Sequence, residues 1–159
     1  GRNTPFETRG YVALAGTFGY ELDITKLTDE DKAKVKLQTA MYHWFNDLVR
    51  EGDYYRIASY GENHLYDCFQ VVSKDKKKSL VFYVQVLNEA SKKSRILKLQ
   101  GLEEGLTYTV KELDMNVSDS IDMVKDVKKA FSGALLMNAG LHFERMWGDF
   151  RAKVIVLEA

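Results

Sequence analysis

The sequence predicts a mainly β protein in which an antiparallel β-sandwich follows a short segment of one strand and one helix. Two observations indicate this fold class. From about residue 53 onward, apolar and polar residues alternate, as they do in half-buried strands. Short polar turns separate these stretches, and they leave no room for the helical crossovers that parallel strands need. Before residue 53 the apolar residues recur at helical spacing. The change of period places a domain boundary at Gly52, between units 1–52 and 53–159.

The first element is expected at Tyr11–Ala15 (YVALA), an unbroken apolar run between Gly10 and Gly16. Such a run is typical of a strand that is buried on both faces, as parallel strands are. A strand of this kind needs neighbours on both sides. We expect those neighbours to lie in sequence that this chain does not contain.

A long helix is expected from Thr28 to Glu51. Thr28 and Asp31 have the spacing of a capping box, and acidic residues fill the first turn. Five apolar residues form one stripe along this helix: Leu37, Met41, Trp44, Phe45 and Leu48. Burying five such side chains contributes on the order of 10 kcal/mol. We therefore expect the sandwich or a second copy of the chain to cover the stripe.

A short strand is expected at Tyr54–Ile57, and two hairpins follow it. The first joins Leu65–Ser73 to Ser79–Leu87 through the basic, solvated turn Lys74–Lys78. The second is expected to join the strands Arg95–Gln100 and Leu106–Leu113 through the glycine-bounded turn Gly101–Gly105.

A last strand is expected at Phe150–Glu158. Its alternate residues face opposite sides, with Phe150, Ala152, Val154 and Val156 on one side and Arg151, Lys153, Ile155 and Leu157 on the other. The stretch Asp114–Ser132 stays open, because a short amphipathic helix and an irregular inserted loop explain its apolar residues equally well.

The composition excludes several classes of protein. Of the 159 residues 45% are hydrophobic, which is enough for one core and a small second one. Lys+Arg and Asp+Glu number 23 each, so no net charge attracts nucleic acid or a membrane surface. No apolar run approaches the roughly 20 residues of a membrane span. The single cysteine, Cys68, favours a reducing compartment, and we expect a cytoplasmic protein.

Residues that could carry chemistry form no specific motif. His43, His64 and His142 lie far apart without metal-ligand spacing, so no metal and no other cofactor is expected. Cys68 fits a core position better than a nucleophile. Four tyrosines could stack on sugar rings, although packing across sheet faces explains them better; they are Tyr54, Tyr55, Tyr60 and Tyr66.

Several segments together resemble one enzyme family. They are TPFETRGYVALAGTFGYELDITKLTDEDKAKVK, YHWFNDLVREGDYYRI, SLVFYVQVL, GLEEGLTYTV, LLMNAGL and WGDF, and the most specific part is GTFGYELD followed by GDYYR. They are similar to the C-terminal portion of bacterial family 36 glycoside hydrolases, which are α-galactosidases. The resemblance covers nearly the whole chain and is weakest over Asp114–Phe131.

The resemblance implies a division into two parts. The family has an N-terminal β-sandwich, a central (β/α)8 barrel that holds the active site, and a C-terminal antiparallel β-domain. By resemblance, Tyr11–Ala15 is the last barrel strand and Thr28–Glu51 the last barrel helix. Residues 1–52 are then a remnant of the barrel, and 53–159 form the C-terminal β-sandwich. A homo-oligomer is also implied, since the family is often tetrameric.

The family's chemistry implies what this chain lacks. A retaining glycosidase uses two carboxyl groups about 5 to 5.5 Å apart. In the family both are aspartates on earlier barrel strands, and no residue here matches either. The resemblance therefore implies an inactive structural and assembly fragment, whose parent hydrolyses terminal α-galactosyl residues of oligosaccharides such as melibiose or raffinose. A carbohydrate-binding module is the alternative.

The resemblance also implies a site rim. Barrel active sites form at the C-terminal ends of the strands, so four residues that follow the expected strand are close to substrate: Gly16, Thr17, Phe18 and Tyr20. A purely structural role in packing the strand exit is an equally good interpretation of these residues.

Overall fold

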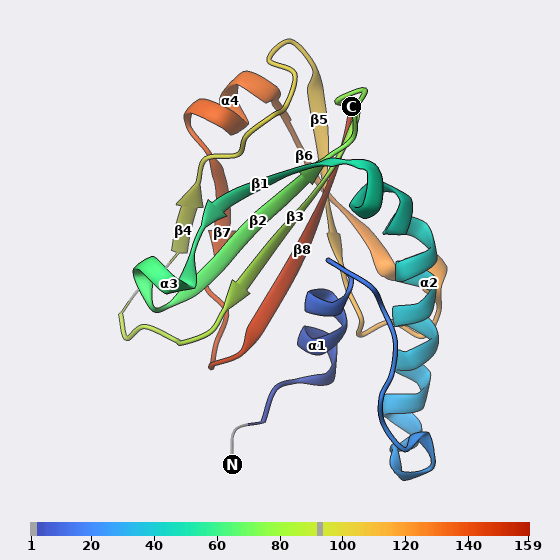
Figure 1. Ribbon diagram of the computed structural model, residues 1–159. Coiled ribbons are helices and arrows are strands. Elements are labelled where there is room, and N and C mark those ends of the chain that lie inside the picture. The colour runs from blue at the N-terminus through green and yellow to red at the C-terminus, as the bar shows by residue number, and fades with distance from the viewer. Residues whose placement is uncertain (1–2, 92–93) are drawn as a thin grey trace.

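The computed structural model describes residues 3–91 and 94–159, and it has three layers (Figure 1). A six-stranded sheet forms the middle layer. Helices α1 (Phe6–Ala13) and α2 (Asp29–Glu51) cover one face of this sheet, and a two-stranded sheet with helix α4 (Gly133–Asn138) covers the other. The predicted mainly β, antiparallel fold class is confirmed. Within the described residues, no helix is both long and apolar enough to cross a membrane.

The large sheet has the strand order β1-β2-β3-β8-β5-β6, and all its neighbouring strands are antiparallel. Its strands are β1 (Asp53–Ala58), β2 (Tyr66–Val72), β3 (Lys78–Gln85), β5 (Thr107–Leu113), β6 (Val124–Ser132) and β8 (Arg151–Glu158). The small sheet pairs β4 (Ser94–Leu97) with β7 (Leu141–Glu144). The short elements are the helix α3 (Tyr60–Asn63) and the 3-10 turns η1 (Ile24–Lys26) and η2 (Ser120–Met123).

Strand β8 is buried on both of its faces. Val154 and Val156 belong to the core beneath α1 and α2, whereas Ile155 and Leu157 belong to the core beneath the small sheet. The alternation predicted for this strand is therefore confirmed. Full burial of one such side chain stabilises a protein by about 1.5 to 3 kcal/mol. Strand β8 therefore stabilises both cores through side chains on its two faces.

The strand expected at Tyr11–Ala15 is wrong, because the chain forms helix α1 over Phe6–Ala13 instead. Phe6, Gly10, Tyr11 and Leu14 are buried at helical spacing. This period becomes visible only when the apolar run is extended back to Phe6. A run of five apolar residues does not by itself distinguish a buried strand from one side of a buried helix.

Helix α2 begins and ends where the sequence predicts. The Thr28 hydroxyl oxygen accepts a hydrogen bond of 3.1 Å from the Asp31 amide, and the Gly52 amide donates to the Leu48 carbonyl at 2.9 Å. A Cβ on Gly52 would clash with Val71 of β2, so the helix and the sheet approach closely at this glycine. Strand β1 begins at the residue that follows Gly52.

The apolar stripe of α2 is mostly covered by the sheet, as expected. Leu37 and Met41 are buried, and Phe45 and Leu48 pack against the same core while remaining partly exposed. Trp44 is the exception, since 47% of its surface is exposed. One aromatic side chain of the stripe therefore still faces solvent.

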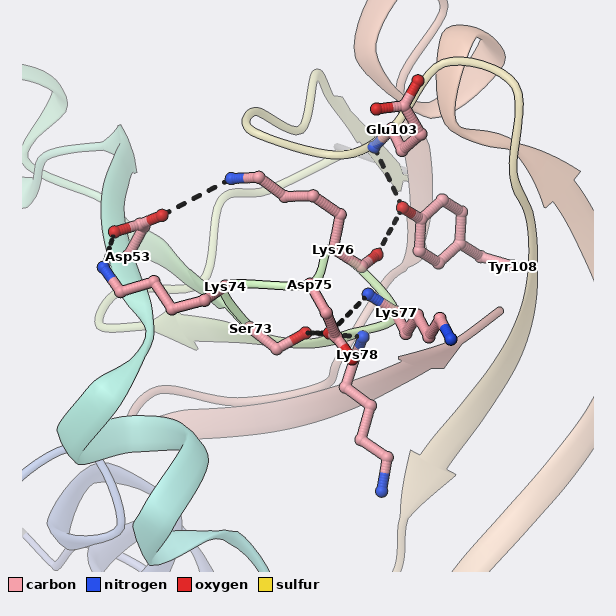
Figure 2. A network of polar contacts seen from close by, with 9 residues as sticks. All are labelled: Asp53, Ser73, Lys74, Asp75, Lys76, Lys77, Lys78, Glu103 and Tyr108. Atoms are coloured by element: carbon pink, nitrogen blue, oxygen red, sulfur yellow. Dashed lines mark hydrogen bonds and ion pairs between the residues drawn. The ribbon is translucent and has the colours of Figure 1, made fainter.

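The first hairpin is confirmed, because β2 pairs with β3 along the full length of β2. Figure 2 shows the polar network at its turn. Lys74 and Lys76 form ion pairs with Asp53 at the start of β1. The Tyr108 hydroxyl donates to the Lys76 carbonyl at 2.6 Å and accepts from the Glu103 amide at 3.0 Å. The turn is thereby tied to β1 and to the loop before β5.

The second predicted hairpin is wrong. Strand β4 pairs with β7, and β5 pairs with β6 and β8. The glycine-bounded loop Gly101–Gly105 is thus a crossing from the small sheet to the large one rather than a hairpin turn. Leu99 and Leu102 are buried in the core between the two sheets. A turn signal between two alternating runs predicts where each strand stops, but it does not identify the strand's partner.

The open stretch Asp114–Ser132 is neither one helix nor one loop, because irregular chain and η2 are followed by the nine-residue strand β6. Val110 of β5 faces Lys129, while the next residue of β5, Lys111, faces Asp126. Two residues of β6 are therefore unpaired in a bulge, and one of them, Lys128, has a φ of 54°. The bulge shifts the apolar residues to a spacing that imitates a helix.

We expect the substitution Gly133→Ala to lower the free energy of unfolding by about 3 kcal/mol, at the upper end for overpacking. A Cβ at this position, where α4 begins, would clash with the backbone carbonyl of Glu103. Gly105→Ala is the matched control, since a Cβ there meets nothing within 4 Å. Urea unfolding of both variants measures the difference. Equal stabilities would contradict this close approach.

Removal of the α2 cap in Thr28→Ala should cost about 1 kcal/mol of stability, because the Asp31 amide loses its acceptor. Thr28→Ser keeps a hydroxyl and should unfold at nearly the parent urea concentration. If Ser and Ala destabilise the protein equally, the cap bond does not contribute to stability.

Candidate functional site

The four residues predicted to be close to substrate lie on an irregular segment between α1 and η1. The segment Gly16–Tyr20 runs alongside α2 (Figure 1). It is flanked by two hollows, of about 160 Å³ and about 250 Å³. Phe18 and Tyr20 line the smaller hollow, and Gly16 and Thr17 line the larger one. The structure therefore places the four residues on one segment but does not bring them together around one pocket.

The rings of Phe18 and Tyr20 are engaged in packing. The centroid of Phe18 lies 5.4 Å from that of Tyr42 on α2, in a stacked arrangement, and 5.4 Å from that of Tyr20, edge to face. Tyr20 in turn stacks on Phe6 of α1. Aromatic pairs of this kind contribute about 0.5 to 1.5 kcal/mol beyond the area that they bury. These two side chains hold the segment against both helices.

A buried amide joins the same elements. Gln38 of α2 is only 2% exposed, and its Oε1 accepts a hydrogen bond of 2.7 Å from the Tyr20 hydroxyl. Its Nε2 donates to the Phe6 carbonyl at 2.9 Å. A Cβ on Gly10 would clash with the Gln38 side chain, so α1 requires glycine where it crosses the amide. Burial raises the pKa of Tyr20 to about 12, which keeps its phenol neutral at physiological pH.

Sequence reasoning missed Gln38. The available signal is its position on α2, next to Leu37 and three residues before Met41, both of which face the core. A polar side chain on the buried face of a helix requires hydrogen-bond partners. The partners, Phe6 and Tyr20, come from segments whose contact with α2 is not evident from the sequence.

Gly16 and Thr17 are exposed and share the larger hollow with Asn46 and Arg50 of α2. A Cβ at Gly16 would meet nothing within 4 Å, so the backbone is open to an approaching ligand. Amide, hydroxyl and guanidinium groups around this hollow can hydrogen-bond to a polar ligand. Of the residues that line the two hollows, Glu21 alone carries a carboxyl group.

The other candidate groups show no catalytic arrangement. His43, His64 and His142 are exposed on separate elements, and no three His, Cys, Asp or Glu side chains in the described residues are placed to hold a metal ion. Cys68 is fully buried in the core between the sheets. Burial, with a smaller contribution from the Asp67 charge, raises the pKa of its thiol to about 12. It is a core residue, as expected, because a thiol of this pKa is scarcely ionised at neutral pH.

The four tyrosines do not form a row on one face. Tyr55 and Tyr66 pack against the core between the sheets. Tyr54 is exposed and stacks on Phe69, and Tyr60 lies edge-on to His64. The packing interpretation therefore explains them better than a sugar-stacking platform does.

Comparison with known proteins finds two family models that match different stretches of the chain. The model of the glycosyl hydrolase family 36 C-terminal domain matches residues 66–157, and a melibiase model matches residues 1–52. The chain is 40% identical over 121 residues to α-galactosidase AgaA of Geobacillus stearothermophilus, which covers 76% of this chain and 16% of that protein. It is 32% identical over 159 residues to α-galactosidase Mel36A of Lactobacillus acidophilus, which covers all of this chain and 20% of that protein.

Solved structures agree with this relationship. The crystal structure of AgaA superposes with a TM-score of 0.86 at 34% identity, over 100% of this chain and 20% of that one. The α-galactosidase of Lactobacillus brevis also gives a TM-score of 0.86, at 31% identity and the same coverage. Variants of AgaA were crystallised with stachyose and with raffinose. The chain spans about a fifth of the length of these relatives. Because the family 36 C-terminal domain model matches residues 66–157, more than half of the chain, the chain belongs to glycoside hydrolase family 36.

Proposed function

We propose that this chain is the C-terminal part of a retaining α-galactosidase that hydrolyses terminal α-galactosyl residues of oligosaccharides. In this proposal residues 1–52 belong to the catalytic barrel and residues 53–159 form the C-terminal β-domain. The domain supports the barrel, and the catalytic aspartates lie outside these 159 residues. The reducing cytoplasm, compatible with the buried free thiol of Cys68, is the proposed location.

The matches to the family 36 C-terminal domain and to α-galactosidases support the proposal, and one observation bears on the missing catalytic pair. Glu21 is the single carboxyl group among the residues that line the two hollows beside Gly16–Tyr20, whereas the retaining reaction needs two facing carboxyl groups. The residues around these two hollows therefore do not supply both the nucleophile and the acid. We assign substrate contact to the exposed Gly16 and Thr17, and positioning of the segment to Phe18 and Tyr20, whose rings pack against the helices.

Self-association is the second part of the proposal. The α2 stripe is covered except for Trp44, which is 47% exposed. An exposed aromatic side chain on a helix is a common anchor of subunit contacts. We propose that the protein forms a homo-oligomer in which Trp44 contributes to the contact.

Incubation of the chain with an aryl α-galactoside should give no saturable release of the aryl alcohol, because the proposed catalytic pair is absent. An α-galactosidase of the same family, assayed in parallel, is the positive control. A saturable activity that co-purifies with the chain through two unrelated chromatography steps would contradict the proposal.

Sedimentation velocity tests the homo-oligomer. The average mass should rise with protein concentration, and Trp44→Glu should shift the distribution toward monomer, because a buried carboxylate without a partner is unfavourable. Leu135→Glu, a change at another exposed apolar residue, on α4, is the control and should leave self-association unchanged. A parent chain that stays monomeric at every concentration disproves this part.

A further inference from the structure

A third hollow, of about 450 Å³, lies where α1, the chain that follows β5 and the loop between β7 and β8 meet. It shares no lining residue with the two hollows beside Gly16–Tyr20. Its volume is within the range of about 300 to 1,000 Å³ that is typical of small-molecule sites. The proposed function assigns no role to it.

An exposed tryptophan stands at this hollow. Trp147 is 72% exposed, and the Arg145 guanidinium lies 3.8 Å from its ring centroid. Exposing an indole ring to water is unfavourable, and tryptophan side chains are enriched at surfaces that contact a binding partner. Because the guanidinium occupies one face of the ring, the other face remains available for a ligand.

The backbone that carries Trp147 is held in place. The buried side chain of Gln85 donates hydrogen bonds to the carbonyls of Met146, at 3.0 Å, and Gly148, at 2.7 Å. The Arg151 Nε donates to the Trp147 carbonyl at 3.1 Å. The carbonyls of three successive residues thus accept hydrogen bonds. The backbone of the loop is already ordered, so a ligand that binds at Trp147 does not have to order it at an entropic cost.

The polar groups of the hollow are also fixed. Glu112 forms an ion pair with Lys153 at 2.8 Å, Asp114 pairs with Lys125 at 2.5 Å, and Glu7 pairs with Lys34 at 2.5 Å. Each carboxylate has further lone pairs that can accept hydrogen bonds from a ligand. Arg151, Lys153 and Asn116, which also line the hollow, can donate.

These features select a class of ligand. The three carboxylates are balanced by the lysines that pair with them and by Arg151, so the hollow offers little net electrostatic attraction to an anion such as a nucleotide or to a cation. An apolar peptide would remove these charges from water without replacing their hydrogen bonds. A neutral sugar offers an apolar C–H face to an indole and hydroxyl groups that donate and accept. We propose that this hollow, the Trp147 hollow, is an accessory binding subsite for a neutral oligosaccharide.

The subsite requires no turnover and does not depend on the proposed function. A chain without α-galactosidase activity can bind sugar at Trp147, and a chain that fails to bind sugar there can still be part of an α-galactosidase. Binding and hydrolysis are therefore measured separately.

Tryptophan fluorescence of the Trp44→Phe variant tests the subsite, because Trp147 is then the only tryptophan of the chain. Titration with raffinose should give a saturable change in emission. Titration with galacturonate should give a much weaker response, since its carboxylate would lose hydration in a hollow whose basic groups are already paired with carboxylates. The absence of a saturable response to raffinose would overturn the proposal, as would an equal or stronger response to galacturonate.

Calorimetry locates the bound sugar without relying on fluorescence. Trp147→Ala should weaken raffinose binding at least about tenfold, and Trp147→Phe should retain part of the affinity. Trp44→Ala removes the other exposed tryptophan, which is outside the hollow, and should bind like the parent chain. Circular dichroism verifies that each variant is folded. Raffinose binding that survives Trp147→Ala would place the sugar elsewhere and disprove the assignment.

Discussion

The structure depends on the two-sided burial of β8. This strand pairs with β3 on one edge and with β5 on the other, and its successive side chains enter the two cores. Without β8 the large sheet would be divided into β1-β2-β3 and β5-β6, with no hydrogen-bonded connection between them. The helical layer and the small sheet would then have no continuous surface to cover. The cohesion of all three layers therefore depends on one strand.

The candidate segment is held by the helical layer. Phe6, Tyr20 and Gln38 connect α1, the irregular segment and α2 through one buried amide and stacked rings. Unpaired buried polar groups are costly, so such a set of contacts is stable only in one arrangement. The position of Gly16 and Thr17 follows from this arrangement, although neither residue forms part of it.

The sequence predicted best where a signal is local and long. Helix α2 has a cap, acidic residues in its first turn and a terminal glycine, and β8 has an uninterrupted alternation. The apolar run Tyr11–Ala15 is too short to show the helical period of α1, which extends back to Phe6. The bulge in β6 gives its apolar residues a spacing that imitates a helix. The partners of β4 and β5 were wrong because pairing between distant strands leaves no mark in either strand alone.

The candidate site shows the same division. Sequence resemblance predicts the segment Gly16–Tyr20 as a candidate site, but Gln38 and Trp147 are placed by contacts with residues distant in sequence. The buried amide requires three segments to meet, and the Trp147 hollow requires α1 to lie beside β8. Neither arrangement can be derived from periodicity.

The position of β8 in the chain also affects how the protein forms. The central strand of the large sheet is made after all the strands that it joins. During synthesis β1-β2-β3, and later β5-β6, emerge from the ribosome before β8. The backbone groups on the edges of β3 and β5 that will pair with β8 are then still unpaired. Unpaired edges of this kind associate readily with other chains. Protection of the nascent polypeptide, by a chaperone or by rapid completion of translation, matters most in the interval before β8 emerges.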